Sequence, residues 1–139
     1  MKSVSELGEA EARLAVDTVV AELKRRGKAA VVAVADRHGE LIALLRMDGA
    51  PLPSLGIAAN KAFTAARNRG PSGDVGRSSR QNGWDICYMG DPRYVGWDGG
   101  LPVMRDGEVL GAVAVSGLTG EEDLELAKLA VARLAEHAG

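Results

Sequence analysis

The sequence predicts one α+β domain in which helices flank an antiparallel sheet. Two pairs of apolar, β-type runs are each joined by a short glycine-containing turn, which is the pattern of a β-hairpin. Segments with helical spacing of apolar residues precede, separate and follow these hairpins. Consecutive hairpins pair antiparallel, so we expect the helices to cover the faces of the sheet. A length of 139 residues suits one domain, which we assign to residues 1–139.

Local signals set the limits of the expected elements. Ser3 and Glu6 form a capping-box pattern for the first helix, which should end at Gly27 after three cations. Ser54 is expected to cap the second helix, and Thr119 with Glu122 to open the last one. The expected order is helix 3–26, strands 29–36 and 40–47, helix 55–69, a loop or at most a short helix at 70–83, an irregular segment 84–98 with one short strand at 86–89, strands 101–105 and 108–116, and helix 120–137.

Composition excludes several classes of protein. The 17 basic and 19 acidic residues nearly cancel, so nothing in the overall charge favours a nucleic acid or a membrane surface as partner. No apolar run is long enough to span a bilayer, and the N-terminus lacks the apolar core of a signal peptide, so a cytoplasmic location is expected. The single cysteine, Cys87, rules out an internal disulfide and a multi-thiolate zinc site, and no metal site is predicted.

Three segments carry a family resemblance. Residues 31–50 (VVAVADRHGELIALLRMDGA), 57–67 (IAANKAFTAAR) and 99–130 (GGLPVMRDGEVLGAVAVSGLTGEEDLELAKLA) together resemble the GlcG/HbpS family, also called the heme-degrading domain family, whose relatives include the C-terminal domain of PduO-type proteins. The resemblance implies a profilin-like fold with a five-stranded antiparallel sheet. It also implies assembly into a homo-oligomer and, as in some members, binding of heme or a related tetrapyrrole.

The motifs that carry the resemblance contain candidate ligand-binding residues. Arg46 and Asp48 end a strand, while Lys61 and Thr64 lie three apart on one face of the second helix. They could present cations and a hydroxyl to a carboxylate or propionate. The alternative is structural: an ion pair of Asp48 with Arg46 or Lys61 would fix the connection between hairpin and helix. Gly99 and Gly100 of the third segment join the candidate ligand-binding residues.

Charge is distributed unevenly along the chain. Residues 61–80 carry a local charge of +4, and the glycine-rich loop within them, with Arg77 and Arg80, could close over an anionic ligand. Such a loop is also often solvated, or pairs with an acidic helix of a neighbouring subunit. The acids at 121–123 are best explained as complementing the dipole of the last helix.

Four of the five aromatic residues fall between Trp84 and Trp97. This clustering indicates either a pocket or an oligomer contact. Within it, Tyr88 and Tyr94 are possible axial ligands for heme, whereas Cys87 lacks the proline of the short Cys-Pro heme motif and is expected to be a small buried residue. The two histidines, His38 and His137, are expected at the surface.

Two functions from different classes follow. The first is a small-molecule-binding protein whose ligand is heme or a related tetrapyrrole, held by Arg46, Lys61 and the arginine loop against the aromatic segment. The alternative is an enzyme that acts on a small organic acid or natural-product intermediate by acid–base chemistry. Its candidate catalytic residues are Asp48, Lys61, Tyr88 and Asp91. A scaffolding oligomer, in which the aromatic segment is only a subunit interface, is the third possibility.

Overall fold

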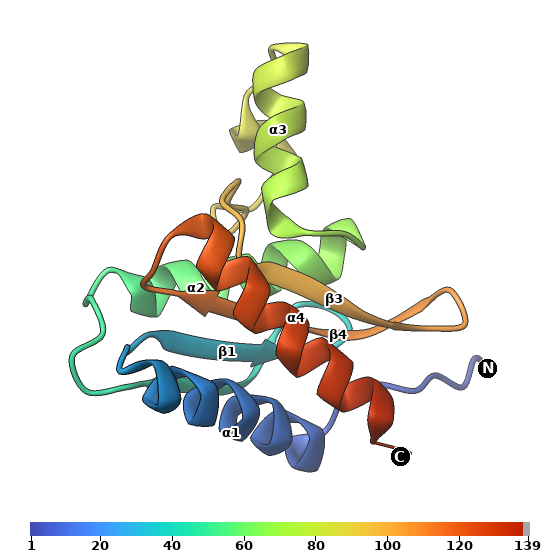
Figure 1. Ribbon diagram of the computed structural model, residues 1–139. Coiled ribbons are helices and arrows are strands. Elements are labelled where there is room, and N and C mark those ends of the chain that lie inside the picture. The colour runs from blue at the N-terminus through green and yellow to red at the C-terminus, as the bar shows by residue number, and fades with distance from the viewer. Residues whose placement is uncertain (138–139) are drawn as a thin grey trace.

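The sheet contains four strands in the order β2-β1-β4-β3, and every neighbouring pair is antiparallel. A computed structural model describes residues 1–137 of the chain (Figure 1). The elements are α1 (Glu9–Arg26), β1 (Val31–Ala35), β2 (Leu41–Arg46), α2 (Ser54–Asn68), α3 (Ser72–Asn82), the 3-10 helix η1 (Ile86–Met89), β3 (Gly100–Arg105), β4 (Glu108–Ser116) and α4 (Gly120–Glu136). The predicted α+β class with an antiparallel sheet is confirmed; the profilin-like description stays a prediction.

Each face of the sheet has its own apolar cluster. Val32 and Val34 of β1 pack with residues of α1 and α4, whereas Val31, Ala33 and Ala35 pack with residues of α2. Side chains alternate between the two faces of a strand, and here both faces are covered, so all of β1 is buried. The result is a three-layer arrangement, with α1 and α4 on one side of the sheet and α2 on the other (Figure 1).

Both predicted hairpins and the C-terminal helix are confirmed. The second hairpin turns at Asp106 and Gly107, whose φ angles of 51° and 78° are the left-handed values that an Asp-Gly turn favours. At the start of α4, the Thr119 hydroxyl accepts a hydrogen bond of 3.1 Å from the backbone N–H of Glu122. Gly27 adopts the left-handed conformation that ends α1.

The N-terminal helix begins later than predicted. Gly8 is its N-cap, and the Glu11 carboxylate accepts a hydrogen bond of 3.0 Å from the Gly8 backbone N–H. The Ser3–Glu6 capping box does not form, because the preceding segment is drawn against the sheet. There the Leu7 N–H donates to the Leu110 carbonyl at 2.8 Å. Tertiary contact therefore overrides a local capping signal.

The middle of the chain also differs from the prediction. Residues 72–82, expected as a loop or at most a short helix, form the 11-residue helix α3. The short strand expected at 86–89 is the 3-10 helix η1, which begins where the Asp85 carboxylate accepts from the Cys87 N–H at 2.9 Å. Within residues 1–137 the sheet therefore has four strands and not five. Ser54 is the first residue of α2 and does not cap it; Pro53 is the N-cap.

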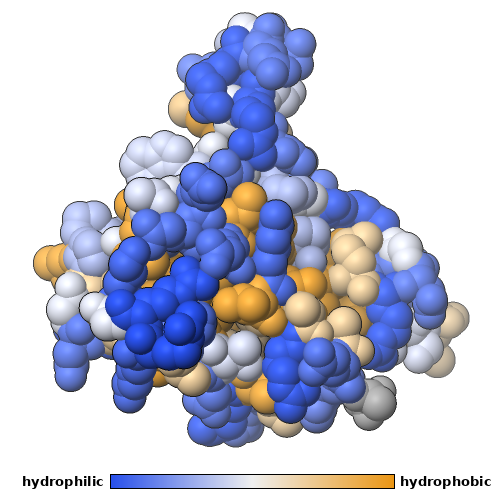
Figure 2. Space-filling model, in the orientation of Figure 1, coloured by the Kyte–Doolittle hydropathy of each residue, from blue (hydrophilic) through white to orange (hydrophobic). Residues whose placement is uncertain are grey.

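Residues 72–98, which we call the arm, include α3 and η1. Figure 1 shows α3 standing away from the sheet and the other helices. The surface of its outer part is largely hydrophilic on the face seen in Figure 2. The arm returns to the body through residues 93–98, and this return positions the candidate site. None of the helices in the described part of the chain combines the length and apolar character needed to cross a bilayer.

Acid should weaken this fold partly through Glu22. The Arg25 side chain hydrogen-bonds the Glu22 carboxylate and, with Arg26, lowers its pKa from 4.5 to about 2. A folded-state pKa below the unfolded value stabilises the protein above the unfolded pKa, and this stability is lost as pH falls through the folded pKa. Glu22→Gln should therefore be less stable than the parent at neutral pH, with the difference shrinking between pH 4.5 and about 2. Urea titrations at several pH values measure this, and a pH-independent difference would contradict it.

Candidate functional site

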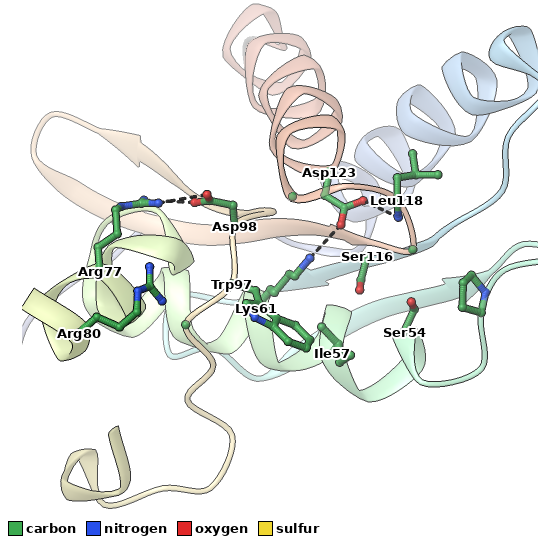
Figure 3. A pocket seen from close by; sticks show the side chains of 14 residues that line it. Ser54, Ile57, Lys61, Arg77, Arg80, Trp97, Asp98, Ser116, Leu118 and Asp123 are labelled. Atoms are coloured by element: carbon green, nitrogen blue, oxygen red, sulfur yellow. Dashed lines mark hydrogen bonds and ion pairs between the residues drawn. The ribbon is translucent and has the colours of Figure 1, made fainter. Parts of the chain in front are cut away.

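A pocket of about 500 Å³ lies where the arm returns to the body (Figure 3). Its walls come from the first two turns of α2, from α3, from residues 96–98, and from the junction between β4 and α4. The lining residues are Pro51, Ser54, Ile57, Lys61, Arg77, Arg80, Gly96, Trp97, Asp98, Ser116, Gly117, Leu118, Gly120 and Asp123.

A buried ion pair lies at this pocket. The Lys61 ammonium donates to the Asp123 carboxylate at 3.0 Å and to the Val115 carbonyl at 3.0 Å. Both side chains are about 3% exposed. Burial lowers the pKa of Lys61 and raises the pKa of Asp123, and the attraction between the two charges opposes both shifts. The second Asp123 oxygen accepts from the Leu118 N–H at 3.1 Å, so this carboxylate also fixes the β4–α4 turn.

A second ion pair joins the arm to the segment that precedes β3. The Arg77 guanidinium donates to both Asp98 oxygens at 3.1 Å. These hydrogen bonds, with a further one to Asp74, raise the pKa of Arg77. Arg80, one turn further along α3, is exposed and extends toward the pocket (Figure 3). Within residues 1–137 it makes neither an ion pair nor a side-chain hydrogen bond.

Polar and apolar groups share the remaining walls. Ser54 and Ser116 are 5% and 4% exposed, and Figure 3 shows both hydroxyls directed into the pocket. Neither hydroxyl makes a hydrogen bond to another described residue. Trp97, which is 61% exposed, adds a large aromatic surface, with Ile57 and Leu118 as aliphatic neighbours. The pocket can therefore take a molecule with an apolar body and a polar, anionic group.

Of the residues predicted for ligand binding, Lys61 and Trp97 line this pocket. Gly99 and Gly100 are buried beneath it, where they make room for Lys61. A Cβ on Gly99 would lie 2.7 Å from the Lys61 ammonium, and one on Gly100 would overlap the Lys61 carbonyl oxygen. Their contribution to the site is the space that α2 needs to approach β3.

Thr64 and Tyr94 hold the returning arm in place. The buried Thr64 hydroxyl accepts a hydrogen bond of 3.0 Å from the Val95 N–H. The Tyr94 ring packs edge-on against Phe63 with 5.0 Å between centroids, and Arg93 stacks on the same Phe63 ring at 4.0 Å. These contacts hold residues 93–95 against α2, and neither Thr64 nor Tyr94 lines the pocket.

The other candidate residues lie outside this pocket. Arg46 and Asp48 are exposed at the end of β2, and neither forms an ion pair within the described residues. The alternative in which Lys61 pairs with Asp48 is wrong, because its partner is Asp123. Tyr88 is 86% exposed on η1. Asp91 is paired with Arg93 at 3.1 Å, and hydrogen bonds from Arg93 lower its pKa.

The aromatic segment does not form one wall. Only Trp97 of its four aromatic residues lines the pocket. The Trp84 ring N–H donates to the Ser78 hydroxyl at 3.1 Å, so this residue braces α3. Cys87, expected to be buried, is exposed, and a hydrogen bond with Asp85 raises the pKa of its thiol. His38 is exposed and His137 partly exposed, which matches the expectation of surface histidines.

The cations of the basic segment 61–80 have different surroundings. Arg67 and Arg69 donate to the backbone carbonyls of His38 and Gly107, at 2.8 Å and 2.5 Å. Arg77 and Arg80, the two arginines of the predicted loop, line the pocket together with Lys61. Both arginines extend from the helix α3 and not from a loop.

Ser54, Ser116 and Asp123 line the pocket but were not predicted as site residues. Ser54 was assigned to a cap and Ser116 to a strand end, and neither position carries a signal for a ligand. Asp123 did carry one. It lies on the apolar stripe of α4 with Leu126, Ala127 and Ala130, whereas the neighbouring acids lie off that stripe. A carboxylate on a buried helical face requires a partner, which here is Lys61.

Comparison with known proteins identifies the family. A family model described as "Haem degrading protein HbpS-like" matches residues 7–132. The chain belongs to the HbpS-like family. It is 35% identical to the protein GlcG of Escherichia coli K12 over 95 residues, which cover 68% of this chain and 69% of GlcG.

Two solved structures of HbpS-like relatives share the fold over nearly the whole chain. A double mutant of HbpS from Streptomyces reticuli has a TM-score of 0.87 at 28% identity and covers 96% of this chain and 90% of that one. A PduOC:heme complex has a TM-score of 0.82 at 25% identity and covers 92% of this chain and 94% of that one. The described residues of the present HbpS-like chain hold no group of three His, Cys, Asp or Glu side chains suited to a metal ion.

Proposed function

We propose that this HbpS-like protein binds a small organic ligand in the pocket between the arm, α2 and the β4–α4 junction. The observation that carries the proposal is that Arg80, which has no ion-pair partner within residues 1–137, lines the same pocket as the exposed Trp97. A solvated aromatic ring costs free energy that ligand contact would recover, and an unpaired guanidinium offers a charge to an anion. Heme or a related tetrapyrrole is the first ligand to test, because relatives are described as heme-degrading and as a heme complex.

The pocket suits the organic part of heme and not its iron. Arg80 could meet a propionate, and the Trp97 indole could lie against the ring, whereas Arg77 already pairs with Asp98 and Asp74. Among the described residues that line the pocket, none is His, Cys, Met or Tyr, the usual axial ligands. Lys61 is already committed to Asp123. A tetrapyrrole in this pocket would therefore be held by its carboxylates and ring, without an iron ligand from these residues.

Titration with hemin and with metal-free protoporphyrin IX tests this function. We expect both to bind saturably, with dissociation constants within a few-fold of each other, because the proposed contacts do not involve iron. Trp97→Ala should weaken both by about tenfold or more, since a buried aromatic contact contributes about 1–3 kcal/mol. Trp84→Phe is the matched control, because Trp84 does not line the pocket.

Two results of the absorbance and fluorescence titrations would contradict the tetrapyrrole proposal. A linear, non-saturating hemin signal would mean adsorption. Saturable hemin binding without protoporphyrin binding would mean iron coordination elsewhere on the chain, for which Tyr88 remains an exposed candidate.

Acid–base catalysis on a small organic acid is the second candidate function. One observation favours it: Lys61 and Asp123 form a buried ion pair, 3.0 Å between ammonium and carboxylate, at the pocket. The other predicted catalytic residues, Asp48, Tyr88 and Asp91, do not line this pocket. Conversion of a bound acid that persists in the Lys61→Met, Asp123→Asn double variant would exclude this pair as the catalyst.

Assembly into a homo-oligomer is part of the proposal. Leu41, Leu44 and Leu45 of the edge strand β2 are 49%, 40% and 40% exposed, and their strand has one unpaired side. Exposed leucines on an unpaired edge strand favour association with another chain, because association would remove their apolar surface from water and pair the backbone groups of the edge. Light scattering of the purified protein measures the mass directly.

A further inference from the structure

We propose that the pocket selects its ligand by one carboxylate, which would lie at the start of α2 between the Ser54 and Ser116 hydroxyls, while Arg80, on the other side of the Trp97 indole, adds a positive charge to the pocket (Figure 3). This inference rests on the proposed function, since it names the class of ligand for the same pocket. The class is a carboxylate with a flat apolar body, to which a tetrapyrrole that presents one propionate to this end of the pocket would also belong.

Charge is the first argument. Three cations and two carboxylates line the pocket. Lys61 is paired with Asp123, and Arg77 with Asp98, so both lining carboxylates have a cation. Arg77 also pairs with Asp74, which does not line the pocket. Arg80 is the lining cation without a carboxylate partner among residues 1–137, and its charge favours an anionic ligand.

The hydroxyls are the second, independent argument. Ser54 and Ser116 are more than nine-tenths buried, and neither side chain has a hydrogen-bond partner among residues 1–137. No fully buried side-chain oxygen of the described residues lacks a partner, so the small exposed part of each serine includes its hydroxyl. The two hydroxyls face the same cavity from α2 and β4 (Figure 3). An oxyanion between them would accept a hydrogen bond from each.

Two further groups act in the same direction. The Lys61 ammonium has three N–H bonds and uses two of them, on Val115 and Asp123, which leaves one for a ligand. The first turn of α2 has no acidic residue, so its dipole favours an anion there, although the N–H groups of Ser54 and Leu55 already donate to the carbonyls of Pro51 and Leu52.

The walls define the rest of the ligand. Trp97 and Ile57 flank the hydroxyls, and Leu118 closes the side toward α4 (Figure 3). These surfaces are flat or aliphatic, and a planar apolar body would lie against the indole. The hydroxyls would bind the carboxylate, and the indole would contact a flat apolar ring. An aromatic acid has both groups, so we propose it over a sugar or a peptide.

The test compares 2-naphthoate with its neutral amide, 2-naphthamide. The readout is the proton–nitrogen NMR signal of the Trp97 indole, which is assigned by its survival in Trp84→Phe, since the chain has two tryptophans. We expect a saturable shift with 2-naphthoate and a dissociation constant about tenfold or more higher for the amide. Loss of one hydrogen bond to a charged group raises a dissociation constant by about tenfold or more.

Variants assign the selectivity to residues. Arg80→Gln should weaken 2-naphthoate by about three- to tenfold and leave 2-naphthamide unchanged, because the variant removes a charge that acts across the pocket and keeps the wall. Ser116→Ala should weaken 2-naphthoate by about three- to tenfold. Arg13→Gln is the matched control: Arg13 is an exposed helical arginine on α1 and does not line the pocket.

Each remaining outcome is decisive. Absence of a Trp97 shift with 2-naphthoate up to its solubility limit would overturn the inference, as would equal affinities for acid and amide or an unchanged acid affinity in Arg80→Gln. The tetrapyrrole proposal fails separately, in the hemin and protoporphyrin titrations. If those fail while 2-naphthoate binds with the expected selectivity, carboxylate recognition stands and the tetrapyrrole does not.

Discussion

Lys61→Met is expected to lower the free energy of unfolding by about 3–5 kcal/mol, a large part of the total for a domain of this size. The variant leaves the Asp123 carboxylate, about 3% exposed, without its cation, and the Val115 carbonyl without its donor. Asp123→Asn should cost a similar amount, because it leaves the Lys61 ammonium buried without a counter-charge. Urea unfolding followed by circular dichroism measures both losses.

The double variant Lys61→Met, Asp123→Asn should be less destabilised than the sum of the two single variants. It contains no buried charge, and the asparagine oxygen can still accept from the Leu118 N–H, as Asp123 does at 3.1 Å. The matched control is the solvent-accessible pair of Lys28 and Glu122, joined at 2.6 Å between the segment that follows α1 and the first turn of α4. Lys28→Met should cost less than about 1 kcal/mol. Equal costs for Lys61→Met and Lys28→Met would show that burial does not govern the Lys61 pair.

The pH dependence of these variants separates charge from packing. Burial raises the pKa of Asp123, and Lys61→Met removes the cation that opposes this shift. With a folded pKa above the unfolded value, the folded protein binds the proton more readily, so the variant should gain stability as pH falls toward the unfolded pKa. In Asp123→Asn, burial lowers the pKa of Lys61, so stability should rise as pH increases through the interval between its folded and unfolded values. A loss of packing alone would give neither slope.

Strong local patterns predicted the parts of the fold that they control. The Asp106-Gly107 turn and the Thr119 cap are confirmed because the residues that form them are adjacent in sequence. Residues 70–83 were predicted as a loop or at most a short helix, because the glycines and serines that α3 contains have low helix propensity. Gly73 and Gly76 pack closely against residues that are distant in sequence. A Cβ on Gly73 would overlap the Asp98 side chain, and a Cβ on Gly76 would overlap the Gly96 backbone. A propensity argument cannot detect a contact of this kind.

Some residues of the candidate site could likewise be predicted from local sequence, and others could not. Lys61 and Trp97 were identified, the first through its motif and the second through its place in the aromatic segment, and both line the pocket. Asp123 and Ser116 lie more than fifty residues after Lys61, and no local spacing joins them to it. The ion pair forms because β4 runs beneath α2 and delivers the start of α4 to Lys61. The pocket is therefore formed by the tertiary arrangement of α2, β4 and α4, which no local sequence pattern shows.

Gly76→Ala is the variant that tests whether the arm completes the pocket. Alanine is the better helix former by about 1 kcal/mol, so on propensity alone the change would stabilise α3. The structure predicts the opposite sign. A Cβ at position 76 would overlap the carbonyl oxygen of Gly96, and both partners are backbone, so neither can rotate away. We expect a cost of about 1–3 kcal/mol, confined to the attachment of the arm.

The consequences of Gly76→Ala should be local and functional. If α3 is displaced from residues 96–98, the Arg77–Asp98 contacts at 3.1 Å break and Arg80 leaves the pocket. Hydrogen exchange should then lose protection in α3 while β1 and β4 retain theirs, and 2-naphthoate affinity should fall by about tenfold or more. Gly56→Ala is the matched control: nothing lies within 4 Å of its Cβ, so it should stabilise α2 by about 0.5–1 kcal/mol and leave the affinity unchanged. Increased protection of α3 in Gly76→Ala would mean that the arm is not held against Gly96, and the pocket would then lose the wall that carries Arg80.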